Sequence, residues 1–382
     1  MEHSFNNART VARHKVAGVW CVLVSGLLSS CNPGLVQIDQ HQETGAAGTR
    51  YSMVFIIHGD GNYGYHDTAG NEYRADEVAL ASARKVAGQN PHAEVFIYHQ
   101  RPRRLFLFLF PLNSGEFYYY RNGQLAVHES YRRDEEQQHF EPELELYRRF
   151  VASDLTRNGT MFLYYGHELP EFGGRGYDAS TPDRTFTVQD LAAGLQGFTS
   201  LARTFDLLVL STCFGGTPHT IGALSSFART IVASPGNLHL SYFDMHPLER
   251  LDLSLQDGDV PAFAKSFARL TFDRLTRNVR TAVSVAVYDT DRVQEFIDSV
   301  GNVYDRTLAA PKGEASRVPA ERCDCADLPQ YALSTMSRGV DVLFRPARFG
   351  RSAQKQEHSG WECWEEKGRQ DVHSPSVESP LK

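Results

Sequence analysis

A short apolar run that ends in a cysteine and is followed by two glycines constrains the fold of this chain most. Residues 206–216 read Asp-Leu-Leu-Val-Leu-Ser-Thr-Cys-Phe-Gly-Gly, and Leu207–Leu210 is typical of a strand buried on both faces. The helix-compatible segment Thr217–Phe227 follows at once. Open α/β sheets place active sites at such strand ends, where a helix start favours a thiolate. Cys213 is therefore a candidate reactive residue, although buried cysteines are also common in protein cores.

A second apolar run ends in a histidine. Residues 160–167 read Thr-Met-Phe-Leu-Tyr-Tyr-Gly-His, and His167 lies 46 positions before Cys213. The helical segment Val188–Leu201 lies between the two runs. We therefore expect two parallel neighbouring strands joined by a helix, with both residues at the same edge of the sheet. A thiol beside an imidazole is the arrangement that nucleophilic catalysis by cysteine uses.

Four blocks of the sequence, taken in order, resemble the clostripain-like cysteine peptidases, of the caspase and gingipain clan. The blocks are Gly166–Glu168, Gly176–Asp178 with Thr185–Leu191, Phe205–Gly216, and Ile231–Gly236. The resemblance implies an α/β fold, a caspase-like three-layer sandwich with a mainly parallel central sheet, here with a β-hairpin insertion. It also implies a cysteine-type endopeptidase without a cofactor. In this reading Cys213 attacks the peptide carbonyl, His167 protonates the leaving amine, and the backbone N–H groups of Glu168 and Cys213 hold the oxyanion.

Two positions depart from the pattern of this family. Glu168 follows the histidine where the family usually has glycine, and Ser211 stands two residues before the cysteine where the family tends to have aspartate. Because that aspartate favours Lys or Arg at the cleavage site, we expect a weaker preference for basic residues here. Ser234, Asp244 and Asp178 complete the candidates for substrate binding, although ordinary loop positions explain such residues equally well.

The first residues have the pattern of an export signal. A basic region precedes the apolar run Val16–Leu28, which is too short for a typical membrane span. The sequence Leu-Ser-Ser-Cys that ends at Cys31 resembles a bacterial lipobox. We therefore expect residues 1–30 to be a lipoprotein signal peptide and Cys31 to carry the lipid, with an ordinary secretory signal as the alternative. The lipid would anchor the mature chain to a membrane of the bacterial cell envelope, outside the cytoplasm.

The rest of the chain divides into three parts. Polar residues without periodicity predict a flexible tether over 31–50, and strand and helix patterns predict a peptidase domain over 51–308. Inside this domain, the pair Asn122-Gly123 between two apolar segments predicts a β-hairpin. We expect residues 309–382 to be an extension with a disordered tail and, in an exported protein, a disulfide from among Cys323, Cys325 and Cys363.

Net charge and cysteine spacing argue against nucleic-acid binding and a metal site. The formal net charge of −7 gives no support for nucleic-acid binding. The resemblance implies a polypeptide substrate, and the lipobox-like sequence predicts contact with a membrane. No metal site is predicted, because Cys323 and Cys325 lack a further cluster with zinc spacing. Two alternatives stay open. One is an α/β hydrolase with Cys213 as nucleophile and His246 as base, and the other is an inactive surface-anchored relative that binds without cleaving.

Overall fold

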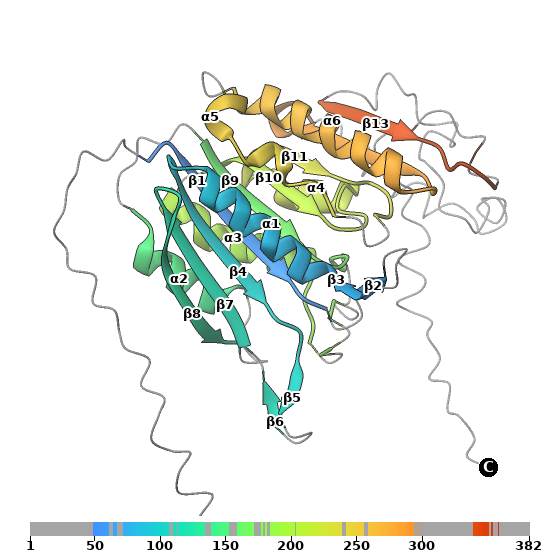
Figure 1. Ribbon diagram of the computed structural model, residues 1–382. Coiled ribbons are helices and arrows are strands. Elements are labelled where there is room, and N and C mark those ends of the chain that lie inside the picture. Colours follow the sequence, from blue (N-terminus) through green and yellow to red (C-terminus); the bar gives the residue numbers. More distant parts are fainter. Residues whose placement is uncertain are drawn as a thin grey trace, which may run out of the picture. The chain divides into compact units, whose positions relative to one another are not determined.

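The computed structural model of the protein describes a defined set of residues (Figure 1). These are residues 49–60, 64–66, 72–106, 110–112, 114–133, 139–152, 159–171, 177–178, 180–181, 184–202, 204–238, 242–255, 259–293, 297, 339–350, 353 and 358. Most of them belong to one sheet and the helices that cover it.

The central sheet has the strand order β13-β12-β11-β10-β9-β1-β4-β7-β8 in the part of the chain described. Its parallel strands are β1 (Tyr51–His58), β4 (Ala93–Gln100), β9 (Gly159–Tyr165), β10 (Phe205–Ser211) and β11 (Ala228–Ala233). The antiparallel strands are β7 (Ser114–Arg121) and β8 (Gln124–Arg132) at one side, and β12 (Val283–Asp289) and β13 (Val340–Arg345) at the other. The parallel strands therefore end together at one edge of the sheet.

Helices cover both faces of this sheet (Figure 1). On one face lie α2 (Glu141–Phe150), α3 (Val188–Ala202) and α4 (Pro218–Leu224), and on the other lie α1 (Ala75–Gln89), the short helices η1 (His246–Leu248) and α5 (Leu251–Ser254), and α6 (Val260–Asn278). Along β1, Val54 and Ile56 face the first group while Phe55 and Ile57 face the second. The continuous apolar run is required because strand side chains alternate between two covered faces.

The expected three-layer sandwich with a mainly parallel sheet is thus the observed fold. The hairpin is also present: Asn122 and Gly123 turn the chain between β7 and β8 with positive φ angles of 55° and 71°. It pairs with β4 and so widens the central sheet. Two smaller antiparallel pairs lie outside the sheet, β2 (Gly64–His66) with β3 (Glu72–Arg74), and β5 (Arg104–Phe106) with β6 (Phe110–Leu112).

The sheet also extends past the domain boundary drawn from the sequence at residue 308. Strand β13 comes from the segment assigned to the C-terminal extension, and it pairs with β12 from Val283↔Arg345 to Tyr288↔Val340.

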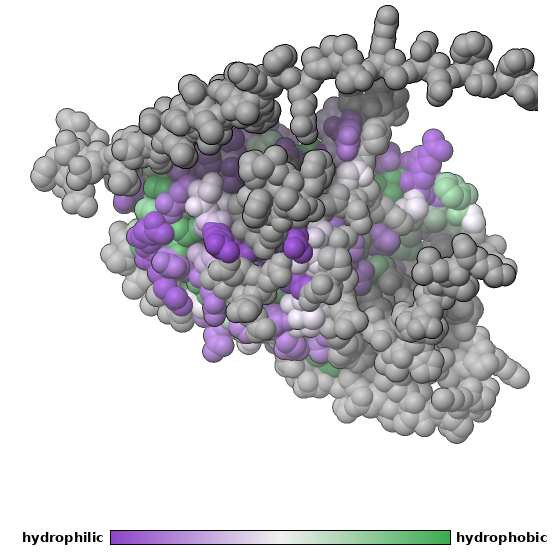
Figure 2. All heavy atoms as spheres, turned by 90° about the horizontal axis from the view of Figure 1, so that it is seen from below, coloured by the Kyte–Doolittle hydropathy of each residue, from purple (hydrophilic) through white to green (hydrophobic). Residues whose placement is uncertain are grey.

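In the face seen in Figure 2, hydrophilic residues of the described part lie among smaller hydrophobic areas. Among the described helices, none is both long enough and apolar enough to cross a bilayer.

Candidate active site

Cys213 and His167 follow neighbouring parallel strands at the same edge of the sheet. The last pair of the ladder between β9 and β10 is Tyr165 with Ser211, and each candidate lies two residues beyond its member of that pair. The hydroxyl of Thr212 donates to the carbonyl oxygen of His167 at 2.7 Å. The two loops are therefore bonded to each other next to both candidate side chains, as expected from the two apolar runs.

The backbone before His167 passes very close to the side chains of Tyr164 and His58. A side chain at Gly166 would place Cβ 2.7 Å from the hydroxyl of Tyr164 and 2.9 Å from Cβ of His58. Both distances are too short for a real side chain, so the loop follows this path only because residue 166 is glycine. His167 itself and Glu168 beyond it are half-buried.

A second contact joins the two loops further along. The hydroxyl of Thr217 donates to the buried carboxylate of Glu171. The same hydroxyl accepts a hydrogen bond from the N–H of Thr220 at 3.2 Å, so Thr217 is the N-cap of α4. Segments 167–171 and 212–217 are therefore bonded at both ends. These two bonds hold Cys213 and His167 at a constant separation.

The backbone immediately after Cys213 has an unusual conformation. Phe214 has a φ of 52°, in the left-handed region that bulky residues rarely adopt. Its N–H donates to the carbonyl of Gly236 at 3.1 Å, and the N–H of Gly216 donates to the carbonyl of Ser234 at 2.9 Å. These two bonds hold the turn after β10 against the turn after β11. Strained backbone of this kind is concentrated at functional sites in proteins.

Two of the substrate-binding candidates are buried inside the protein. The side chain of Ser211 is fully buried and accepts the N–H of Phe243 at 2.7 Å. Ser234 is also fully buried, with its hydroxyl 2.8 Å from the carbonyl oxygen of Ser284. Both hydroxyls therefore hold loops in place at the edge of the sheet.

The two acidic candidates already have partners. Asp178 is buried and accepts the N–H of Ser180 at 2.8 Å, and its second oxygen lies 3.7 Å from Nε2 of His58. Asp244 is half-buried and forms an ion pair with Arg274 at 3.0 Å. Asp244 is thus paired with a cation, and Asp178 is buried, so neither carboxylate is freely available to a basic substrate side chain.

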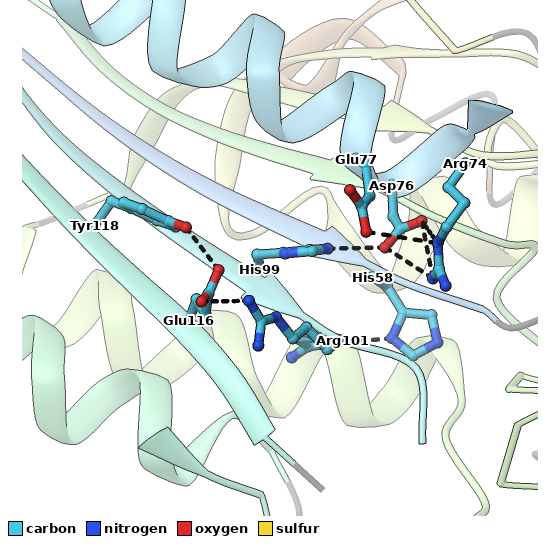
Figure 3. A network of polar contacts seen from close by, with 9 residues as sticks. His58, Arg74, Asp76, Glu77, His99, Arg101, Glu116 and Tyr118 are labelled. Carbon is cyan, nitrogen blue, oxygen red and sulfur yellow. Dashed lines mark hydrogen bonds and ion pairs between the residues drawn. The ribbon is translucent and has the colours of Figure 1, made fainter. Parts of the chain in front are cut away.

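A buried polar network lies beside this site, at the carboxyl ends of β1 and β4 and the amino-terminal half of β7 (Figure 3). His99 contacts the carboxylate of Asp76 at 2.8 Å, and the hydroxyl of Tyr118 donates to Glu116 at 2.6 Å. Nδ1 of His58 lies 3.0 Å from the side-chain oxygen of Gln100. No local sequence pattern predicts this network, because its members come from separate strands and helix α1.

His58 belongs to this network as a neutral, buried side chain. The amide nitrogen of Gln100 donates to the carboxylate of Glu143 at 2.8 Å, so the amide oxygen faces His58 and Nδ1 carries the proton. Burial lowers the pKa of His58 to about 3; Asp178 opposes this, and Arg133 and Arg184 add to it. A fully buried neutral imidazole cannot reach a substrate. His246, the other histidine considered, lies in η1 and is 3.2 Å from Glu249.

Several expected residues lie outside the described part of the chain. These are the lipid-attachment candidate Cys31 and the disulfide candidates Cys323, Cys325 and Cys363. Within the described residues, no group of three or more His, Cys, Asp or Glu side chains could hold a metal ion.

Sequence reasoning missed Thr212, Thr217 and Asn237. Thr212 and Thr217 bond the two loops, and Asn237 lies against the Cys213 thiol, with Oδ1 3.2 Å from Sγ. Each contact joins segments that are far apart in the chain. Only the proximity of Thr212 and Thr217 to Cys213 could have drawn attention to them.

Comparison with known proteins finds similarity at the level of structure. No protein-family model and no curated protein matches the sequence. A secreted C11 cysteine protease from Bacteroides thetaiotaomicron, "iotapain", superposes with a TM-score of 0.54 at 11% identity, covering 86% of this chain and 98% of that one. An inactive zymogen C11 protease from Parabacteroides distasonis also gives 0.54, at 12% identity, over 82% of this chain and 91% of that one. The sheet that brings Cys213 and His167 to one edge thus has the fold of the C11, clostripain-like cysteine proteases.

Proposed function

We propose that this protein is a membrane-anchored cysteine endopeptidase that hydrolyses peptide bonds through Cys213 and His167. The observation that carries the proposal is the bond from the Thr212 hydroxyl to the His167 carbonyl, which fixes the ends of two neighbouring parallel strands side by side. The similar fold of two C11 cysteine proteases supports the same reaction class.

The chemistry follows from these two side chains. The Cys213 thiol loses its proton to solvent, and the sulfur lone pair attacks the peptide carbonyl carbon. The N–H groups of Cys213 and Glu168 donate to the oxyanion that forms. As the C–N bond breaks, the imidazolium of His167 gives its proton to the leaving nitrogen. Water then attacks the thioester, His167 accepts a proton from it, and the sulfur leaves as thiolate.

A peptide library tests this proposal directly. The purified protein from Gln42 onward is incubated with a diverse mixture of peptides, and the cut bonds are identified by mass spectrometry. We expect cleavage that disappears after the thiol is alkylated. Binding of peptides without any cleavage would instead support the inactive relative, and turnover of small esters alone would support the α/β hydrolase.

The same profile should show only a weak preference for Arg or Lys before the cleaved bond. Ser211 replaces the acidic residue, and Asp178 and Asp244 are each engaged with other groups of the protein. A neutral pocket gains no Coulomb energy from a basic side chain. A profile dominated by Arg and Lys would contradict this expectation, and Asp244→Asn would then test whether the half-buried carboxylate supplies the charge.

We also propose that Cys31 carries the lipid that holds the protein to the cell envelope. The support is the lipobox-like sequence that ends at this cysteine. Cys31→Ala should abolish labelling by radioactive fatty acid and release the protein from the membrane fraction, because several acyl chains provide the anchor. Gln40→Asn, a change in the predicted tether outside the lipobox-like sequence, is the matched control and should keep both. Full membrane retention of an unlabelled parent protein would exclude the lipid anchor.

A further inference from the structure

The sulfur of Cys213 lies between two groups of the turn after β11, residues 234–238. Sγ is 3.2 Å from the side-chain oxygen of Asn237, and the backbone N–H of Leu238 donates to the sulfur at 3.4 Å. Two consecutive residues of one turn therefore contact the candidate nucleophile. Asn237 is an exposed residue of this turn.

This turn is held firmly against the nucleophile. The N–H groups of Phe214 and Gly216 donate to the carbonyls of Gly236 and Ser234, at 3.1 Å and 2.9 Å. The hydroxyl of Ser234 lies 2.8 Å from the carbonyl of Ser284 in β12. Because the turn is bonded both to the nucleophile segment and to the sheet, the contact between sulfur and asparagine is part of the fold.

The two contacts suit different protonation states of the sulfur. A thiol has one proton to donate, and the side-chain oxygen of Asn237 accepts it. A thiolate has none and needs donors, and the N–H of Leu238 is one. The asparagine amide also has an NH₂ group, which faces the sulfur after a half turn about the last side-chain bond. The same residue can therefore bind the sulfur before and after ionisation.

We propose that Asn237 is a further catalytic residue, which together with the Leu238 N–H holds the Cys213 sulfur and stabilises it as a thiolate ready to attack. The inference rests on the proposed peptidase function. In this step the S–H bond breaks, the electron pair stays on sulfur, and the proton passes to water. The amide of Asn237 turns and donates to the new anion.

Other ionisable groups lie on the elements that surround the Cys213 segment. They are His167, Glu168 and Glu171 on the loop after β9, His219 on α4, Asp244 beyond the turn, and Tyr288 on β12. All of them stay unchanged when only Asn237 is replaced. A difference between parent and variant therefore reports on the asparagine.

The test measures the ionisation of Cys213 without any peptide substrate. Full-length parent and variants are alkylated with iodoacetamide from about pH 5 to about pH 10, a range that brackets the ordinary thiol pKa. Modification of the Cys213 peptide is followed by mass spectrometry. The variants are Asn237→Ala, which removes the amide, and Asn237→Asp, which adds a charge of the same sign as the thiolate. Gln89→Glu adds the same charge at the exposed end of α1 and is the matched control.

We expect the alkylation midpoint to rise by about half a pH unit in Asn237→Ala and by about one unit in Asn237→Asp. The control should keep the parent midpoint, and thermal unfolding should show that all variants fold. A midpoint that is unchanged or lower in Asn237→Ala would overturn the proposal, because the asparagine would then favour only the neutral thiol. A raised midpoint in a protein that cleaves no peptide would refute the peptidase function while leaving the thiolate contact established.

Discussion

Replacing Cys213 with alanine should abolish peptide cleavage, and replacing His167 should reduce it by roughly a thousandfold or more. The first change removes the sulfur that forms the thioester. The second removes the proton donor for the leaving nitrogen, so the tetrahedral intermediate returns to substrate. The rate of cleavage of the best library peptide, measured for each variant and for the double variant, provides the readout.

The two losses should not add in the double variant, because the side chains act in one reaction step. Both side chains lie beyond strand ends and are half-buried, so both variants should unfold at temperatures close to that of the parent. His246→Ala is the matched control and should keep its activity, since this histidine is exposed and lies in η1. A His167→Ala variant with nearly full activity would refute the dyad. Loss of activity in the His246 control would favour the α/β-hydrolase mechanism.

Acid should destabilise the parent protein more steeply than a His58→Asn variant. Burial lowers the pKa of His58 from 6.5 to about 3 in the folded state. Between these two values the unfolded chain binds a proton at this residue and the folded protein does not. The contribution of neutral His58 to the free energy of unfolding is therefore fully present above pH 6.5. It is lost as the pH falls toward about 3, by about 1.4 kcal/mol per pH unit.

Urea unfolding at a series of pH values measures this effect. The variant will be less stable near neutral pH, because asparagine fills less of the space against Tyr177, whose ring stacks on His58 at 4.2 Å. The two stability curves should nevertheless converge as the pH falls from about 6 to about 4.5, by about 2 kcal/mol. Carboxylates that titrate in the same range affect parent and variant alike. Parallel curves would mean that His58 has the same pKa in the folded protein and in the unfolded chain.

The sequence by itself determined the strand ends that carry Cys213 and His167. Two continuous apolar runs with a helix between them predict parallel neighbours in a covered sheet, because such strands bury both faces. Asn122-Gly123 determined the hairpin for a local reason, since the positive φ angles of the turn favour these residue types. Information of this kind is contained in short windows of the chain.

Only the tertiary structure decided which side chains surround Cys213. Ser211 and Asp178 looked available for a substrate, but one is fully buried and the other contacts His58 and Ser180. Asn237 was not among the predicted site residues, yet its side-chain oxygen is 3.2 Å from the Cys213 sulfur. Strand β13 joins the sheet from the segment assigned to the C-terminal extension. Burial and contact depend on how loops from separate strands pack together, and a local pattern does not encode that packing.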